Sequence, residues 1–246
     1  MSPDRSPDLV LALELADAAD AIALGRFRAH DLVVETKPDL TPVTEADRAI
    51  EEAIRAHLAT ERPDDGILGE ELGETRGSGR RWIIDPIDAT KNYLRGIPIF
   101  ATLIALEDLV AVVSAPALGR RWWAERDRGA FSEGRRLHVS RVTRVEDAVL
   151  TYTSLKGFDE RFLRLAARSW APRGFGDFWQ YMLLAEGAVD ACVESAANLW
   201  DLAAPKLIVE EAGGRLTDLA GQPRADGGNA LASNGLLHAE VLAALN

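Results

Sequence analysis

The chain has 246 residues, of which 47% are hydrophobic and 27% are charged, the composition of an ordinary folded protein. Its 28 basic and 39 acidic side chains give a net charge of −11, which argues against a nucleic-acid partner because phosphate-backbone binding needs a basic surface. The single cysteine, Cys192, excludes an intrachain disulfide and a zinc site closed by several thiolates.

Two helices are predicted at the start of the chain. Apolar residues recur on one helical stripe over residues 7–28. The segment 41–44 leads into a second helix whose apolar residues are spaced by four, and Thr44 with Asp47 has the spacing of a capping box. In this pattern Asp47 either only caps the helix or also takes part in chemistry.

Strands are predicted in the middle of the chain, and strands alternate with helices at its end. The expected strands are 66–69, 81–85, 99–106, 110–115, 121–125, 149–153, 188–193, 215–217 and 230–232. The expected later helices are 160–170, 179–187, 202–212 and 235–245. This order favours a layered α/β sandwich.

One linker-like stretch, 74–80, is too short to separate independent domains. We therefore expect a single unit, with approximate halves 1–140 and 141–246. Residues 106–110 contain no Gly or Asn for a tight primed turn, so a shortened or irregular hairpin is expected there. Trp122 and Trp123 alternate across a strand, which predicts one ring in the core and the other at the surface or an interface.

Acidic residues cluster at three places where apolar strands end or helices begin. Glu70 follows an apolar pair, Asp85 and Asp88 close the segment WIIDPID, and Asp201 lies in WDLAA. Pro86 keeps Asp85 extended and removes a backbone donor, so the two aspartates can converge with the carbonyl of residue 87 between them.

Such a set of oxygen ligands, without a nearby His or Cys, favours Mg²⁺ or Mn²⁺ over zinc. The four carboxylates carry a charge of −4 and would balance two divalent cations. Asp88 is also predicted to be the N-cap of a short turn, 89–94, whose free N–H groups would attract a phosphate.

The segment WIIDPIDATKNY resembles the signature W-I-x-D-P-[IL]-D-G-T-x-N-[FY] of the inositol monophosphatase-like family, and WDLAAPKLIVEEAGG at 200–214 resembles its second signature. GEE at 69–71 and VTEAD at 43–47 are similar to two further family motifs, in the same order. The resemblance implies a Mg²⁺-dependent phosphomonoesterase with an α/β/α/β/α sandwich fold, commonly a homodimer.

Within that family, stretches outside the acidic signatures are most similar to the histidinol-phosphatases of actinobacterial type. One of these stretches is GDFWQYMLLAEGAVD. The resemblance implies hydrolysis of L-histidinol phosphate to L-histidinol and phosphate in histidine biosynthesis. The alternatives are an inositol-1-phosphatase, another sugar or nucleotide phosphatase of the same fold, and a catalytically silent metal-binding or interaction protein.

The family pattern implies two or three Mg²⁺ ions per site, with Mn²⁺ as the alternative. Glu70, Asp85 and the Ile87 carbonyl would hold the first ion. The second would be held by Asp85, Asp88 and Asp201. Without such a set, each of these carboxylates alone would be read as a loop acid or a helix cap.

The same resemblance assigns the catalytic and phosphate-binding residues. Thr90 and Glu70 would orient and deprotonate the attacking water, and Asp47 would polarise the Thr90 hydroxyl. Asp88, Ala89 and Thr90 would bind the phosphate. Ala89 stands where the family has Gly, which would strain the backbone if φ must be positive there.

Glu194 and Asp177 are the expected contacts for the remainder of the substrate, by their similarity to family positions that line the same pocket. Glu194 could instead cap the turn 196–198, and Asp177 could cap a helix that begins near residue 179. Lys37 and Glu71 are expected to be surface residues, although the resemblance also implies a basic residue near the metals at the position of Lys37.

Apolar runs are far shorter than the ~20 residues that a membrane-spanning helix needs. No basic leader with an apolar stretch precedes Leu9. We therefore expect a cytoplasmic protein whose partner is a small phosphate monoester, with no membrane partner.

Overall fold

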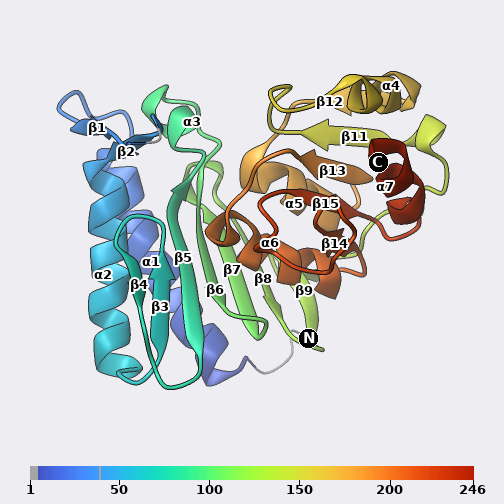
Figure 1. The fold of residues 1–246 in the computed structure, drawn as a ribbon. Helices are drawn as coiled ribbons and strands as arrows, with labels where there is room; N and C mark the ends of the chain where they lie inside the picture. Colours follow the sequence, from blue (N-terminus) through green and yellow to red (C-terminus); the bar gives the residue numbers. More distant parts are fainter. Residues whose placement is uncertain (1–4, 39) are drawn as a thin grey trace.

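Helices α1 (Pro7–Arg26) and α2 (Glu45–Glu61) pack side by side as the first layer of the computed structural model, which describes residues 5–38 and 40–246 (Figure 1). Ser6 caps α1 through its hydroxyl, 3.1 Å from the Leu9 amide nitrogen. The predicted capping box of α2 is present, and α1 ends two residues before the predicted end.

The second layer is a sheet of eight strands in the order β10-β9-β8-β7-β6-β5-β3-β4. Its strands are β3 (Gly66–Gly69), β4 (Gly73–Thr75), β5 (Arg81–Asp88), β6 (Ala101–Leu106), β7 (Val110–Ala115), β8 (Arg120–Glu125), β9 (Gly129–Ser132) and β10 (Arg135–Arg136). Strands β3 and β5 are parallel, and the other neighbours are antiparallel. A separate two-stranded ribbon, β1 (Val34–Thr36) and β2 (Pro42–Thr44), leads into α2.

Two helices, α5 (Asp177–Ala185) and α6 (Leu199–Glu211), lie between this sheet and a second sheet of five strands (Figure 1). The second sheet has the order β12-β11-β13-β15-β14 and consists of β11 (Val149–Tyr152), β12 (Ala171–Arg173), β13 (Ala191–Glu194), β14 (Arg215–Thr217) and β15 (Ala230–Ser233). Its outer face is covered by α4 (Glu160–Arg168) and α7 (His238–Leu245). The five layers confirm the predicted α/β/α/β/α sandwich.

Both faces of the eight-stranded sheet are buried over its central strands, from β5 to β9. Trp122 packs into the core that faces α5 and α6, whereas Trp123 packs into the core that faces α1 and α2 and stacks on Phe131 at 4.5 Å between ring centroids. Both tryptophans are at most 5% exposed. The prediction that one ring would lie at the surface or an interface is therefore wrong, because helices cover the sheet on each side.

The predicted elements lie within three residues of the observed bounds, and β3, β7 and β14 match them at both ends. The short strands β1, β2, β4, β9, β10 and β12 were not predicted. The turn between β6 and β7 is short but regular: the Leu109 amide donates to the Leu106 carbonyl at 2.8 Å, and Asp108 takes a φ of 58°. Aspartate tolerates this left-handed conformation better than most residues, so no glycine is needed.

Candidate active site

The carboxyl end of β5 carries two of the predicted acidic residues. Asp85 pairs with Leu103 of β6 in regular register, and a β-bulge then separates it from Asp88, which pairs with Ala101. Thr102 donates its hydroxyl to the Pro86 carbonyl at 2.8 Å, which holds the bulged strand in place. The bulge changes the direction of the side chains at the end of the strand.

Asp201 reaches the same place from the first turn of α6. Its Oδ2 accepts the Asn198 amide at 2.6 Å, so Asp201 is the third helical residue of a capping box, whereas the N-cap itself is Asn198. Asp201 also joins Asp85 and Asp88, because each of the three contributes a carboxylate oxygen to a group whose members lie within 4.8 Å of one another. Acidic side chains from β5 and from α6 therefore meet at one place.

This cluster suits a divalent cation. The Oδ1 atom of Asp85 is buried and has no hydrogen-bond partner among the described residues. Burial raises the pKa of Asp85 well above its ordinary value, and the neighbouring Glu70 and Asp88 raise it further. Burial also raises the pKa of Asp201, to about 6. Like charges held this closely need a positive partner, and an all-oxygen donor set favours a hard cation.

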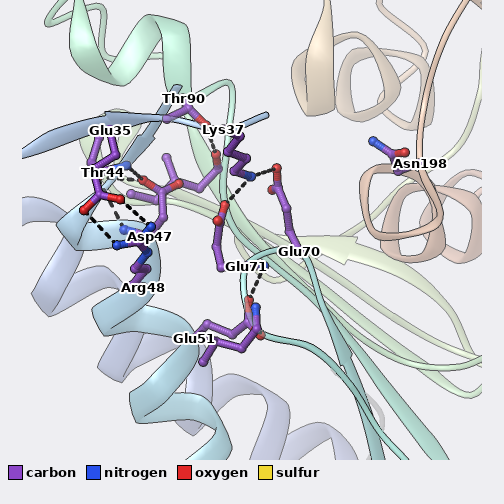
Figure 2. Close-up of polar contacts among 12 residues, drawn as sticks. Glu35, Lys37, Thr44, Asp47, Arg48, Glu51, Glu70, Glu71, Thr90 and Asn198 are labelled. Atoms are coloured by element: carbon purple, nitrogen blue, oxygen red, sulfur yellow. Dashed lines mark hydrogen bonds and ion pairs between the residues drawn. The ribbon is translucent and has the colours of Figure 1, made fainter. Parts of the chain in front are cut away.

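Glu70 does not join the group of three, because its carboxylate is paired with Lys37 (Figure 2). The Lys37 Nζ lies 2.7 Å from Glu70 Oε1 and 2.6 Å from Glu71 Oε1. Burial alone would lower the pKa of Lys37, but the two carboxylates outweigh this and raise it.

The prediction that Lys37 and Glu71 are surface residues is wrong. Their side chains are 18% and 5% exposed, and the β1–β2 ribbon carries Lys37 over the acidic site. The lysine therefore supplies a positive charge next to a predicted metal ligand.

Thr90 and Asp47 are close to these acids but are not bonded to each other. The Thr90 hydroxyl donates to the Ile87 carbonyl at 3.0 Å. Asp47 Oδ2 accepts the amide and hydroxyl of Thr44, whereas its Oδ1 is buried without a partner in the described part of the chain. Burial raises the pKa of Asp47 to about 7. Asp47 thus completes the capping box of α2 with Oδ2 and leaves Oδ1 free for another donor.

Helix α3 (Thr90–Leu94) begins one residue later than predicted. Its N-cap is Ala89, which has no capping side chain, and not Asp88. Asp88 is the last residue of β5, and its Oδ2 accepts the Phe178 amide of α5 at 2.5 Å. The prediction of an Asp88 cap is therefore wrong, because the left-handed turn at Ala89 directs the Asp88 side chain toward α5.

Ala89 has φ 65° and ψ 44°, the left-handed conformation that its departure from the family pattern made a concern. An L-residue there is strained by about 1–2 kcal/mol, and a glycine would relieve part of this strain. Ala89→Gly should therefore raise the free energy of unfolding by about 0.5–1 kcal/mol, measured by urea denaturation. The control Ala56→Gly, at an exposed position inside α2, should lower it by about 1 kcal/mol. A loss of stability in Ala89→Gly would show that the alanine methyl group is needed for packing.

A cavity of about 380 Å³ extends from these acids to Asp177 and Glu194. None of the described residues that line it is His or Cys. Burial, together with the nearby charge of Asp177, raises the pKa of Glu194 to about 8. The two capping interpretations are wrong: Glu194, in β13, accepts from Thr153 and Gln180 instead of capping the turn 196–198, and the N-cap of α5 is Gly176 rather than Asp177.

Three further residues around Glu194 were not singled out from the sequence. Thr153 donates its hydroxyl to Glu194 Oε2, and Gln180 Nε2 donates to the same oxygen at 2.9 Å. The Tyr181 hydroxyl is buried next to the cavity without a partner among the described residues. The polar pair Gln180-Tyr181 within an otherwise apolar helix was the available signal, because buried polar groups need partners.

Within residues 5–38 and 40–246, none of the helices is both long and apolar enough to span a membrane.

Comparisons with known proteins agree with this arrangement. The model of the inositol monophosphatase family matches residues 4–246. A histidinol-phosphatase of Streptomyces coelicolor is 54% identical, with 99% of this chain and 98% of that protein covered. A histidinol-phosphatase of Mycobacterium tuberculosis is also 54% identical, with 97% and 98% covered. The solved structure of a Thermotoga maritima IMPase superposes with a TM-score of 0.90 at 33% identity, covering 98% of this chain and 97% of that one. The chain therefore belongs to the inositol monophosphatase family.

Proposed function

We propose that this protein is a metal-dependent phosphatase that hydrolyses L-histidinol phosphate to L-histidinol and phosphate. The observation that carries the proposal is the 54% identity, over nearly the whole of both chains, to proteins named histidinol-phosphatase. The acidic cluster beside a second pair of carboxylates supports it, because the substrate has a phosphate at one end and basic nitrogens at the other.

Mg²⁺ is the proposed cofactor, two or three ions per site, with Mn²⁺ as the alternative. One ion would be held by Asp85, Asp88 and Asp201, and another by Glu70, Asp85 and the Ile87 carbonyl. When bound, the metals supply positive charge that stabilises the entering and leaving oxygens of the phosphate. Glu70 becomes available when it leaves its ion pair with Lys37, which keeps its second partner, Glu71.

Thr90, Asp47 and Glu70 are the proposed water-activating residues. The Thr90 hydroxyl turns from the Ile87 carbonyl to the free Oδ1 of Asp47, and its own lone pairs then orient the attacking water. Glu70 takes the proton of that water. Burial raises the pKa of Asp47 to about 7, so its carboxylate is a stronger hydrogen-bond acceptor for the Thr90 hydroxyl than an ordinary aspartate.

The proposed phosphate-binding residues are Asp88, Ala89 and Thr90, where α3 begins without a capping side chain. Asp177 and Glu194 are proposed to bind the amine and imidazole of the substrate. Thr153 and Gln180 occupy one oxygen of Glu194 and leave the other for the ligand. A cation bound there would balance the negative charge of the two carboxylates, of which Glu194 is buried.

A substrate panel with controlled metal content tests the function. EDTA should abolish phosphate release, Mg²⁺ or Mn²⁺ should restore it, and histidinol phosphate should have the highest kcat/KM. A higher kcat/KM for inositol 1-phosphate, or for a sugar or nucleotide phosphate, would show that histidinol phosphate is the wrong substrate, whereas the assignment as a phosphatase would stand. Activity that persists in metal-free protein would overturn the mechanism, and inactivity on every ester with metal bound would favour a silent protein.

The same panel with Glu194→Gln tests the cation pocket. One charge-assisted hydrogen bond is worth roughly 1.5–3 kcal/mol, so KM for histidinol phosphate should rise about ten- to hundredfold. KM for inositol 1-phosphate, which offers only hydroxyls, should change much less. Glu160→Gln, whose side chain is 89% exposed on α4, is the control and should behave as the wild type. An equal rise of KM for both esters would show that Glu194 does not recognise the positive charge of the substrate.

We also propose a homodimer. Trp170 and Phe175 are 72% and 41% exposed and lie at an apolar groove of about 470 Å³ that Val149 and Leu183 also line. Contiguous apolar surface of this kind favours a protein contact. Sedimentation equilibrium should give twice the 26.7 kDa mass of the chain, and a monomer at all concentrations would disprove the dimer.

A further inference from the structure

Glu51 is a buried carboxylate of α2 that lies outside the acidic cavity. It is one helical turn after Asp47 and has no solvent exposure. Its Oε2 accepts the Glu71 amide at 2.7 Å, and its Oε1 accepts the Leu72 amide at 3.1 Å and the Arg55 Nε at 2.8 Å. Figure 2 shows Glu51 on α2, next to the segment that carries Glu70 and Glu71. Glu51, on a helix of the first layer, therefore holds the turn between β3 and β4 of the eight-stranded sheet.

The turn between β3 and β4 depends on this contact. The amides of residues 71 and 72 have to find acceptors when they are withdrawn from water, and Glu51 supplies both. Gly69 permits the close approach, since a Cβ built on it would lie 1.9 Å from Glu51 Oε1. Arg55 extends the contact across the hairpin by donating to the Gly73 carbonyl and, at 3.0 Å, to Thr75 Oγ1.

Glu70 lies between two fixed points of this turn. Its own amide donates to the Ile84 carbonyl of β5 at 3.2 Å, and the next amide donates to Glu51. The backbone of Glu70 is thereby tied to the strand that carries Asp85 on one side and to the helix that carries Asp47 on the other.

We infer that Glu51 is a positioning residue, which holds the Glu70–Glu71 backbone so that the Glu70 carboxylate can join the metal site without reordering the turn. The inference rests on the proposed function only in taking Glu70 as a metal ligand. Glu51 itself touches neither metal nor substrate. Its effect reaches the site through two backbone hydrogen bonds.

A carboxylate is required here because every group that faces it is a donor. Two amides and a guanidinium need acceptors on both oxygens, and a glutamine would place an NH₂ group against one of them. Hydrogen bonds to a charged group are also the stronger ones. The charge is balanced by Arg55, so the helix can bury the acid.

Glu51→Gln tests the inference, with Glu52→Gln as the matched control on the exposed side of the same helix. The readout is the Mg²⁺ concentration that gives half of the metal-induced rise in melting temperature. This concentration should rise about tenfold or more in Glu51→Gln, the usual effect of losing a partner of a metal ligand, and stay unchanged in Glu52→Gln. At saturating Mg²⁺, KM for the phosphate ester should equal that of the wild type.

Two outcomes separate this inference from the proposed function. If Mg²⁺ does not raise the melting temperature of the wild type, the proposed metal site fails. If the wild type responds and Glu51→Gln has the same Mg²⁺ midpoint with only a lower melting temperature, Glu51 is merely structural and the inference is overturned.

Gly69→Ala is a second variant that keeps the test decisive if Glu51→Gln does not fold. Its Cβ would displace the Glu51 carboxylate, so the Mg²⁺ midpoint should again rise. Gly79→Ala is the control, because a Cβ there meets nothing within 4 Å. A Gly69→Ala protein with the wild-type midpoint would count against the inference.

Discussion

An Asp85→Asn protein should lose all measurable phosphatase activity, yet its metal-free form should melt at a higher temperature than the metal-free wild type. The folded chain holds carboxylate oxygens of Asp85, Asp88 and Asp201 within 4.8 Å. Burial and the charge of Glu70 raise the pKa of Asp85, so its ionised form costs folding free energy when no cation is bound. Asparagine removes that cost together with a ligand that both metals would share.

Phosphate release at saturating Mg²⁺ and thermal melting with and without EDTA measure the two effects. Mg²⁺ should raise the melting temperature of the wild type much more than that of Asp85→Asn. Asp226→Asn, with its side chain 55% exposed, should match the wild type in both assays. A variant that is active, or one that is less stable than the wild type without metal, would contradict the picture of a repulsive site completed by cations.

Thr90→Ala should lower kcat by about 10²–10⁴, the usual contribution of a positioned proton-transfer group, while Mg²⁺ still stabilises the protein. The hydroxyl is the proposed link between Asp47 and the attacking water, and it contributes no metal ligand. Steady-state kinetics and the metal-induced rise in melting temperature are the two measurements.

Thr60→Ala, at an exposed position of α2, serves as the control and should leave kcat unchanged. If kcat of Thr90→Ala stayed within about threefold of the wild type, another group would have to activate the water. A loss of Mg²⁺ stabilisation would instead assign Thr90 to metal binding.

Local sequence signals predicted most of the fold. The fourfold spacing of apolar residues and the Thr44–Asp47 capping box gave the start of α2, because such signals act within one or two turns of a helix. Strand-like runs located β3 and β7 at both ends. The alternation of Trp122 and Trp123 could not show that helices cover both faces of the sheet, because burial depends on layers that form far away in the chain.

The candidate site was predictable where the family resemblance reaches, and less so elsewhere. The convergence of Asp85, Asp88 and Asp201 followed from the two signatures. Lys37 was misassigned because its partners lie more than thirty residues away and meet it only through the β1–β2 ribbon. Glu51 was overlooked because Glu51 and Arg55 have the spacing of a solvent-exposed helix pair, and nothing local reveals the turn packed against them.

Because Asp201 lies on a helix between the two sheets, the acidic cluster is formed by residues from distant parts of the chain. A cation held there would connect the end of β5 with the start of α6 as a reversible cross-link does. Neither sheet alone carries all three acidic residues, so the affinity for a cation depends on how the layers pack together. Substitutions that loosen α6 in the core behind Asp201 would therefore weaken cation binding without touching a ligand, and defects in folding and in catalysis would appear together.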